Sequence, residues 1–394
     1  MTALNQRFVR ILGISVAVIL MLDVVALAGW SEVHAHRPSW ASQHALVAGP
    51  KGLPVLERFV EHARGLRFKE PVNVELVDRQ QLNDARHTEE DLANSNSTSA
   101  LHATSRPDVG SVLGVMGLVP KGANVSGAVD NAEDNGVAGV YFPRQKRLLV
   151  IGQEQTPFVR EVLVHELTHA LDDQYFDIGR RDIGLHDDEE LDSWRALNEG
   201  DATSVEKKYL DAMSPADRQS ALAAQSALAG GGPPTVIDDL LSYPYVAGLR
   251  FVEKLRDSGG NKAVNAAFRH PPTTSEQILR PDHFLTLDTP TIVTKPTPRG
   301  TPVGRGVFGV LQLGELLSTV ADGPAIRDAL DGWNGDRFVA WTEPSGATCL
   351  DINVANDSPT AAGKLAAAFQ TWLAHNPTGS VNVAGDVVKL ERCA

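Results

Sequence analysis

The sequence has few cysteines, few positive charges and no long basic run. Cys349 and Cys393 are the only cysteines among 394 residues, too few for a disulfide-rich scaffold or a thiolate metal cluster. Lys and Arg number 36 against 49 Asp and Glu, a formal net charge of −13. Nucleic-acid binding needs a basic surface, so we exclude nucleic acid as a partner. Hydrophobic residues make up 42% of the chain, which indicates a folded protein rather than a disordered one.

A single apolar run stands near the N-terminus. Residues 11–30 are almost all apolar and follow Arg7 and Arg10, a pattern typical of a signal peptide or a membrane anchor. The run is about as long as a membrane-spanning helix, and residues 26–28 and 33–35 have the small-x-small form of a signal-peptidase site. We predict that residues 1–35 form a signal or anchor helix. The main domain would then lie outside the cytoplasm, tethered to the cell membrane by one helix or secreted. A buried helix of a soluble protein is the remaining interpretation.

Hydrophobic periodicity and turn residues predict an α+β fold in two parts. We assign residues 50–285 to a mostly helical domain and residues 300–394 to a small C-terminal α+β unit, with the proline-rich residues 286–304 as an extended linker. In the first part we expect helices at 53–63, 158–174, 187–213, 236–257 (irregular at Pro244) and 261–268, a strand at 72–77 and a β-hairpin at 137–142 and 147–151. In the second we expect helices at 307–320 and 360–375 and strands at 337–341, 348–354 and 380–391.

The two cysteines lie near the ends of two of these C-terminal strands. Strands that are neighbours in a sheet bring such residues within bonding distance. An exported protein also meets the oxidising conditions in which disulfides persist. We therefore predict a Cys349–Cys393 disulfide.

The segment that carries chemistry lies within the helix expected at 158–174. Residues 164–170 read Val-His-Glu-Leu-Thr-His-Ala. Residues four apart lie on one face of a helix, so His165 and His169 present both imidazoles to one point, which is a two-ligand metal site. Glu166 lies beside them, within reach of a metal-bound water. Two histidines and a glutamate on an exposed helix surface are the plainer interpretation.

A catalytic zinc ion needs a third protein ligand and an open position for water. Residues 197–202 read Leu-Asn-Glu-Gly-Asp-Ala on the next expected helix, which makes Glu199 the best candidate. His186 and Asp201 are the rivals. Together the two segments resemble the gluzincin metallopeptidases, the thermolysin-like group, in which an HExxH helix is followed by a helix with an Asn-Glu pair.

The resemblance implies a zincin-like domain in residues 50–285, with an edge β-hairpin before the HExxH helix to hold an extended peptide. It also implies Zn²⁺ as the cofactor, His165, His169 and Glu199 as its ligands, and Glu166 as the general base. Asp173, four residues after His169, and Asp201, on the Glu199 helix, are candidates to orient a ligand. The candidates for stabilising an oxyanion are Tyr243, Tyr245 and His283.

These residues predict a zinc-dependent hydrolase, a metallopeptidase that cleaves peptide or protein substrates outside the cytoplasm. Metal-activated water would attack the carbonyl group, and Glu166 would take its proton. One alternative is a catalytically inactive zincin fold that serves as an extracytoplasmic binding or assembly module. Another is a zinc hydrolase that acts on a non-peptide amide or ester.

Overall fold

The computed structural model describes residues 52–95, 108–180, 183, 188–228 and 236–394. The predicted helix within residues 1–35 and His186 lie outside these ranges. No helix within the described ranges combines the length and apolar character needed to cross a membrane. The fold is α+β and mostly helical, with a three-stranded mixed sheet and a C-terminal five-stranded antiparallel sheet, as the sequence predicts in outline.

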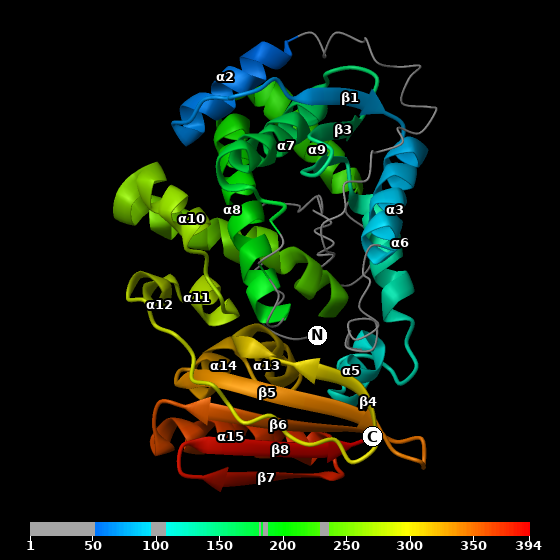
Figure 1. The fold of residues 1–394 in the computed structure, drawn as a ribbon, viewed down its shortest axis with the longest axis vertical. Coiled ribbons are helices and arrows are strands. Elements are labelled where there is room, and N and C mark those ends of the chain that lie inside the picture. The colour runs from blue at the N-terminus through cyan, green and yellow to red at the C-terminus, as the bar shows by residue number, and fades with distance from the viewer. Residues whose placement is uncertain (1–51, 96–107, 181–182, 184–187, 229–235) are drawn as a thin grey trace.

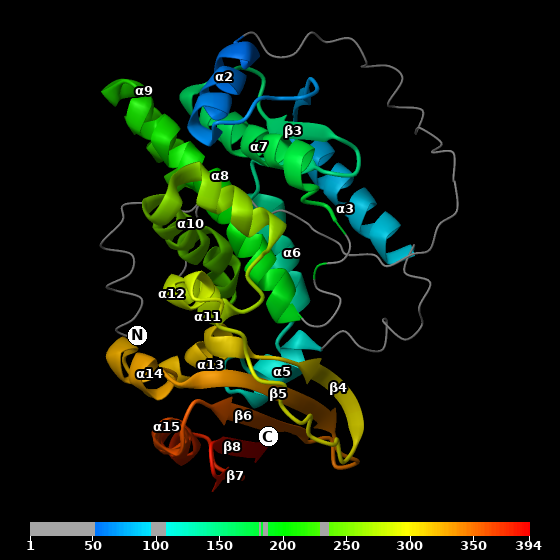
Figure 2. The ribbon, with the colours of Figure 1, turned by 60° about the vertical axis from the view of Figure 1, so that its left-hand side comes forward.

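A cluster of helices forms the upper part of the molecule in Figures 1 and 2. Its central helix, α7, is capped by Thr156, whose side chain accepts a hydrogen bond from Val159 N–H, and begins at Pro157. This part, the helical lobe, has a large apolar core to which α2, α7, α8 and α10 all contribute. Its helices are α2 (Leu53–Arg64), α7 (Pro157–Phe176), α8 (Asp188–Ala212), α9 (Pro215–Leu228), α10 (Val236–Arg269), α11 (Ser275–Leu279) and α12 (Pro281–Leu285).

The small sheet of the helical lobe packs beside α7. Strand β3 (Arg147–Ile151) pairs in parallel with β1 (Asn73–Val77) and antiparallel with β2 (Gly139–Phe142), which confirms the predicted hairpin. Strands β1 and β2 are the two edge strands of this sheet. Helices α3 (Arg79–Ser95) and α6 (Val125–Gly136) lie side by side next to this sheet in both views. Arg86 joins the two helices through Glu133, at 2.5 Å, and Asp134, at 3.1 Å.

The C-terminal unit is a five-stranded sheet covered by helices on one face. Side chains on that face, among them Phe338, Ile352 and Leu390, form a second core with α13, α15 and the short helix α5 (Val109–Val115). The strand order is β4 (Thr301–Gly306), β5 (Trp333–Thr342), β6 (Thr348–Asn356), β8 (Val387–Cys393) and β7 (Gly379–Ala384). The covering helices are α13 (Gly309–Ser318), α14 (Gly323–Ala329) and α15 (Pro359–His375).

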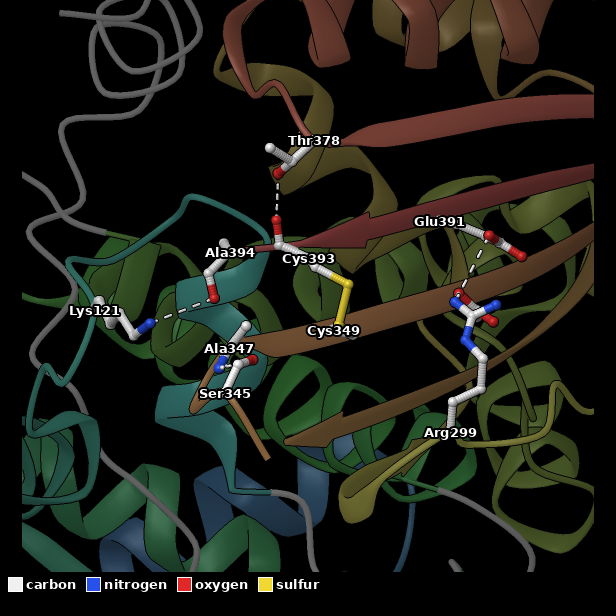
Figure 3. Close-up of a disulfide and its surroundings, with 10 residues drawn as sticks. Lys121, Arg299, Ser345, Ala347, Cys349, Thr378, Glu391, Cys393 and Ala394 are labelled. Atoms are coloured by element: carbon white, nitrogen blue, oxygen red, sulfur yellow. Dashed lines mark hydrogen bonds and ion pairs between the residues drawn. A yellow bond between two sulfur atoms is a disulfide. The ribbon is translucent and has the colours of Figure 1, made fainter. Parts of the chain in front are cut away.

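The predicted disulfide lies on the other face of this sheet. Cys349 of β6 and Cys393 of β8 are direct cross-strand partners with their Cα atoms 4.0 Å apart, and the bond is formed (Figure 3). The linker between α12 and β4 runs over the same face, where Asn353 Nδ2 donates to Thr294 O at 2.7 Å. The guanidinium of Arg299 lies 4.9 Å from the ring centroid of Trp341. A persistent disulfide is typical of proteins outside the cytoplasm.

Some predicted elements need correction. The strand expected at 380–391 is a hairpin, because Gly385, with φ +66°, begins a two-residue turn between Ala384 and Val387. The backbone of α10 stays helical at Pro244, where an irregularity was expected. It breaks at Gly259 and Gly260, between the helices predicted at 236–257 and 261–268, which confirms that division. The end of the proline-rich linker forms strand β4. The helices that were not expected include α3, α5, α6, α9, α12 and α14.

Helices α8 and α10 cross without side chains between them. A Cβ atom added to Gly200 would lie 2.1 Å from Gly248 C, and one added to Gly248 would lie 1.9 Å from Ala196 O. Real Cβ atoms essentially never come within 3.0 Å of another heavy atom in this way. Glycine at both positions therefore allows the two backbones to touch, right beside Glu199.

We expect Gly248→Ala to lower the free energy of unfolding by roughly 2–3 kcal/mol or more, because the added methyl group forces α10 away from α8. Gly314→Ala is the matched control, since a Cβ there meets its nearest atoms at 3.9 Å. Urea unfolding followed by circular dichroism measures both. Equal stability of the Gly248 variant and the parent would contradict the close contact.

The helical lobe and the C-terminal unit meet through buried acidic groups. Glu189 of α8 accepts hydrogen bonds from the backbone N–H and the hydroxyl of Ser275, at 2.6 and 2.7 Å. The N–H of Leu311 in α13 donates to the same hydroxyl at 3.1 Å. Nearby, burial and the neighbouring charge of Asp239 raise the pKa of Glu315 on α13 to about 7.

This pKa makes the stability depend on pH. The folded protein keeps a proton on Glu315 that the unfolded chain releases above pH 4.5, so the free energy of unfolding falls as pH rises from there to about 7. We expect Glu315→Gln to remove roughly 1–3 kcal/mol of this fall. Urea unfolding of parent and variant at pH 5.5 and 7.5 gives the difference between their slopes. Parallel slopes would rule out the raised pKa.

Candidate metal centre

Three potential metal ligands converge between α7 and α8. His165, His169 and Glu199 are all buried, at 0%, 1% and 2% exposure. His165 Nε2 lies 3.0 Å from His169 Nε2 and 3.1 Å from Glu199 Oε2, and His169 Nε2 lies 3.5 Å from the same oxygen. The helical spacing of the two histidines and the crossing of α8 over α7 bring the three donor atoms to one point, so this group can hold a metal ion.

The donor set fits zinc. Ligand atoms about 2.0–2.1 Å from a tetrahedral zinc ion stand about 3.3 Å from each other, close to the three separations observed. The atoms are also the nitrogen and oxygen types that zinc prefers. Glu199 Oε1 and Glu166 Oε1 are buried without a hydrogen-bond partner. A buried polar atom without a partner destabilises the fold, and a bound cation would give these two oxygens a partner.

The charges around His165, His169 and Glu199 favour a positive charge between them. Burial raises the pKa of Glu199, but the charges and hydrogen bonds of His169 and His165 outweigh it and lower the pKa to about 2. Burial lowers the pKa of His165, yet hydrogen bonds to Glu199 and Glu206 together raise it well above its usual value. The carboxylates around the two histidines therefore favour a positive charge at this point.

Glu166 is held beside this group by strand β2. Its Oε2 accepts a hydrogen bond of 2.7 Å from the N–H of Tyr141, while Oε1 has no partner. A Cβ atom on Gly139 would lie 3.2 Å from Glu166 Cγ, so the strand packs directly on the glutamate. Burial raises the pKa of Glu166, with partial opposition from His169 and His165. A carboxylate so placed is suited to exchange a proton with a bound water.

The residue that orients a ligand histidine is Glu206, which the sequence analysis missed. Its Oε2 lies 2.8 Å from His165 Nδ1, the nitrogen opposite the one that faces the other ligands. Gln225 of α9 donates to Glu161 and lies 3.5 Å from Glu206 Oε1, which ties this carboxylate into the lobe. A carboxylate on the outer nitrogen fixes both the tautomer and the ring orientation. The available signal was spacing, because Glu206 follows Glu199 by two helical turns on the same face.

The two residues predicted for this role bind elsewhere. Asp173 accepts hydrogen bonds from the Tyr141 hydroxyl at 2.7 Å and from Lys146 at 2.5 Å, so it anchors the β2–β3 hairpin to α7. Asp201 forms ion pairs with Arg64 at 2.6 Å and Arg256 at 2.5 Å. Those contacts bind α2, α8 and α10 together, and His169 Nδ1 has no partner.

Of the three residues predicted to stabilise an oxyanion, the structure brings only Tyr245 next to the metal ligands. Its ring centroid is 6.3 Å from that of His165, and its buried hydroxyl has no hydrogen-bond partner. Burial, with the charges of Glu199 and Glu166, raises its pKa well above the usual value, so it stays a donor. Burial, with the charges of Glu189 and Asp192 rather than those of the candidate ligands, raises the pKa of Tyr243. His283, on α12, binds Asp288 at 2.8 Å, and α12 lies apart from α7 in both views.

No family model, curated protein or solved structure matches this chain. The functional assignment therefore depends on the geometry of the site.

We expect Glu206→Ala to weaken zinc binding by about 10–100-fold, because the His165 ring loses the partner that orients it. Asp211→Ala is the matched control, since Asp211 is an exposed carboxylate on the same helix that forms ion pairs with Lys207 and Arg218 at the surface. Competition with a chromogenic chelator measures the affinities. Equal affinity of the Glu206 variant and the parent would exclude the orienting role.

Proposed function

We propose that this chain is a zinc-dependent hydrolase of the gluzincin type, a peptidase that acts outside the cytoplasm. The observation that carries the proposal is the convergence of His165, His169 and Glu199. Their donor atoms lie about as close to one another as the ligands of one tetrahedral zinc ion, and Glu166 lies beside them. His165 and His169 would hold the ion on one helix and Glu199 on the next. The zincin-like architecture of the domain is part of the same proposal.

Each residue of the site has its own role in the proposed hydrolysis. A bound zinc ion polarises a carbonyl group and acidifies its water. Glu166, with one oxygen held by Tyr141 N–H and the other without a partner, takes the proton from the attacking water and passes it to the leaving amine. Tyr245 donates a hydrogen bond from its hydroxyl to the developing oxyanion. Glu206 keeps the His165 ring in place.

The surroundings of Glu166 favour a peptide as the substrate. Strand β2 is one of the two edge strands of its sheet and lies against this glutamate. An extended peptide can add to the edge of such a strand by backbone hydrogen bonds, which would place its carbonyl groups near the base. The Cys349–Cys393 disulfide supports a location outside the cytoplasm. A binding module without activity would need no base, and this chain keeps one at the required position.

The first experiment measures zinc per chain by mass spectrometry, together with hydrolysis of fluorescein-labelled casein. We expect about one zinc ion in the parent and in Glu166→Gln, and strongly reduced zinc in Glu199→Ala. Glu166→Gln should lose casein hydrolysis because it has no base. Asp211→Ala should keep both properties.

The outcomes separate the alternatives. A folded parent without zinc would refute the metal site. Zinc binding with an unchanged rate in Glu166→Gln would refute the mechanism. Zinc binding without hydrolysis of any peptide or protein would refute the peptidase and leave the binding module or a hydrolase of non-peptide amides or esters.

A further inference from the structure

The two edges of the C-terminal sheet differ in protection. Natural sheets guard their edges with proline, bulges or charges, because a bare edge pairs with other strands. Strand β4 carries Pro302, has a register shift between Pro302 and Gly304, and accepts a hydrogen bond of 2.6 Å from Asp108 N–H at Val303 O. Strand β7, at the opposite margin, pairs with β8 in unbroken register and has neither proline nor charge. Figures 1 and 2 show it at the lower margin of the molecule.

Strand β7 also exposes an apolar side chain on the face that helices cover. Val383 is paired with the buried Val388 but is itself 49% exposed. Its neighbour on that face, Val381, packs partly against the core. The helical layer therefore stops short of the sheet margin and leaves Val383 uncovered.

The side of α15 next to β7 carries uncharged and mostly small side chains. Leu373 of α15 lies against Gly379, where a Cβ would meet its Cδ2 at 2.7 Å, so this side of the helix faces β7. Gly363, Gln370 and Ala374 share the neighbouring face of the helix and are exposed. The charged Lys364 lies on the other side, where it pairs with Asp328 of α14 at 2.7 Å.

We propose that two copies of this chain form a symmetric dimer through β7 and α15. The sequence Val381-Asn382-Val383 is a palindrome, so two antiparallel β7 strands centred on Asn382 place each Val381 opposite the partner copy's Val383. This register satisfies the isologous contact that a two-fold axis requires. The paired strands make one ten-stranded sheet, because each copy contributes a five-stranded sheet.

The lack of charge on this flank favours a second copy as the occupant, and the contact area sets how tightly that copy binds. Two chains of net charge −13 repel each other, and this flank brings no acidic side chain of β7 or α15 into the contact. A 17-residue helix is about 25 Å long, and a helix layer on a sheet layer is about 20 Å deep, which gives about 500 Å² of flat contact per copy. Specific interfaces begin near about 600 Å² per partner. We therefore expect a dimer that dissociates on dilution.

The test uses the full chain in a mild detergent and analytical ultracentrifugation over a dilution series. We expect the parent to move from dimer to monomer on dilution, and V383K to be monomeric at every concentration, because the dimer would bury an unpaired charge. S345K, on the exposed β5–β6 turn, should behave as the parent. Unchanged circular dichroism of V383K shows that it folds.

Cross-linking gives an independent measurement. Both native cysteines are in the disulfide, so N382C introduces a single thiol on the proposed two-fold axis. We expect N382C to give a disulfide-linked dimer on a non-reducing gel, and S345C to stay monomeric. A parent that is monomeric throughout, a dimer that survives V383K, or equal cross-linking of N382C and S345C would overturn the proposal. The result is independent of the zinc site, because neither β7 nor α15 contributes a residue to it.

Discussion

The burial of charge along α7 is the constraint on which the helical lobe depends. This helix lies at the centre of the lobe, and most of its titratable side chains have lost contact with water. Each charge must find a partner inside the protein or become neutral. The buried titratable residues of α7 are Glu161, His165, Glu166, His169, Asp172 and Asp173.

The partners of these residues fall into two kinds. Towards its C-terminal end, α7 meets cations: Arg64 binds Asp172 at 2.7 Å, and Lys146 binds Asp173. These contacts neutralise charge and fix neighbouring elements to the helix. In the middle, His165 and His169 meet a carboxylate, Glu199, instead of an arginine or lysine. The candidate site is this part of the helix, because imidazoles and a carboxylate that face one another can take up a cation.

Local patterns predicted what depends on local spacing. The HExxH segment and the proline after Thr156 specify one helix with both histidines on one face, and the β2–β3 hairpin precedes it where its turn residues indicate. Glu199 followed from the need for a third ligand. The contacts of Asp173 and Asp201 could not be read in this way, because Lys146, Arg64 and Arg256 reach them only through the tertiary fold.

The same limit explains the other differences. Tyr243 and Tyr245 are two residues apart on α10, so they point about 200° apart around the helix, and only the packing of α10 decides which one meets His165. The prediction of one strand at 380–391 missed the β7–β8 turn. Only two residues, Gly385 and Asp386, separate two runs of strand-forming residues, so the runs resemble a single strand.

The glycine contact between α8 and α10 has a consequence for how the centre moves. Helices separated by side chains can slide as rotamers change, but Gly200 and Gly248 leave nothing between the two backbones to rearrange. The two helices must therefore travel together in any opening of the buried site. Glu199 precedes one of these glycines directly, and Tyr245 lies three residues before the other. The relative position of Glu199 and Tyr245 is thus preorganised. When the site closes, only α7 and β2 have to return to these two residues.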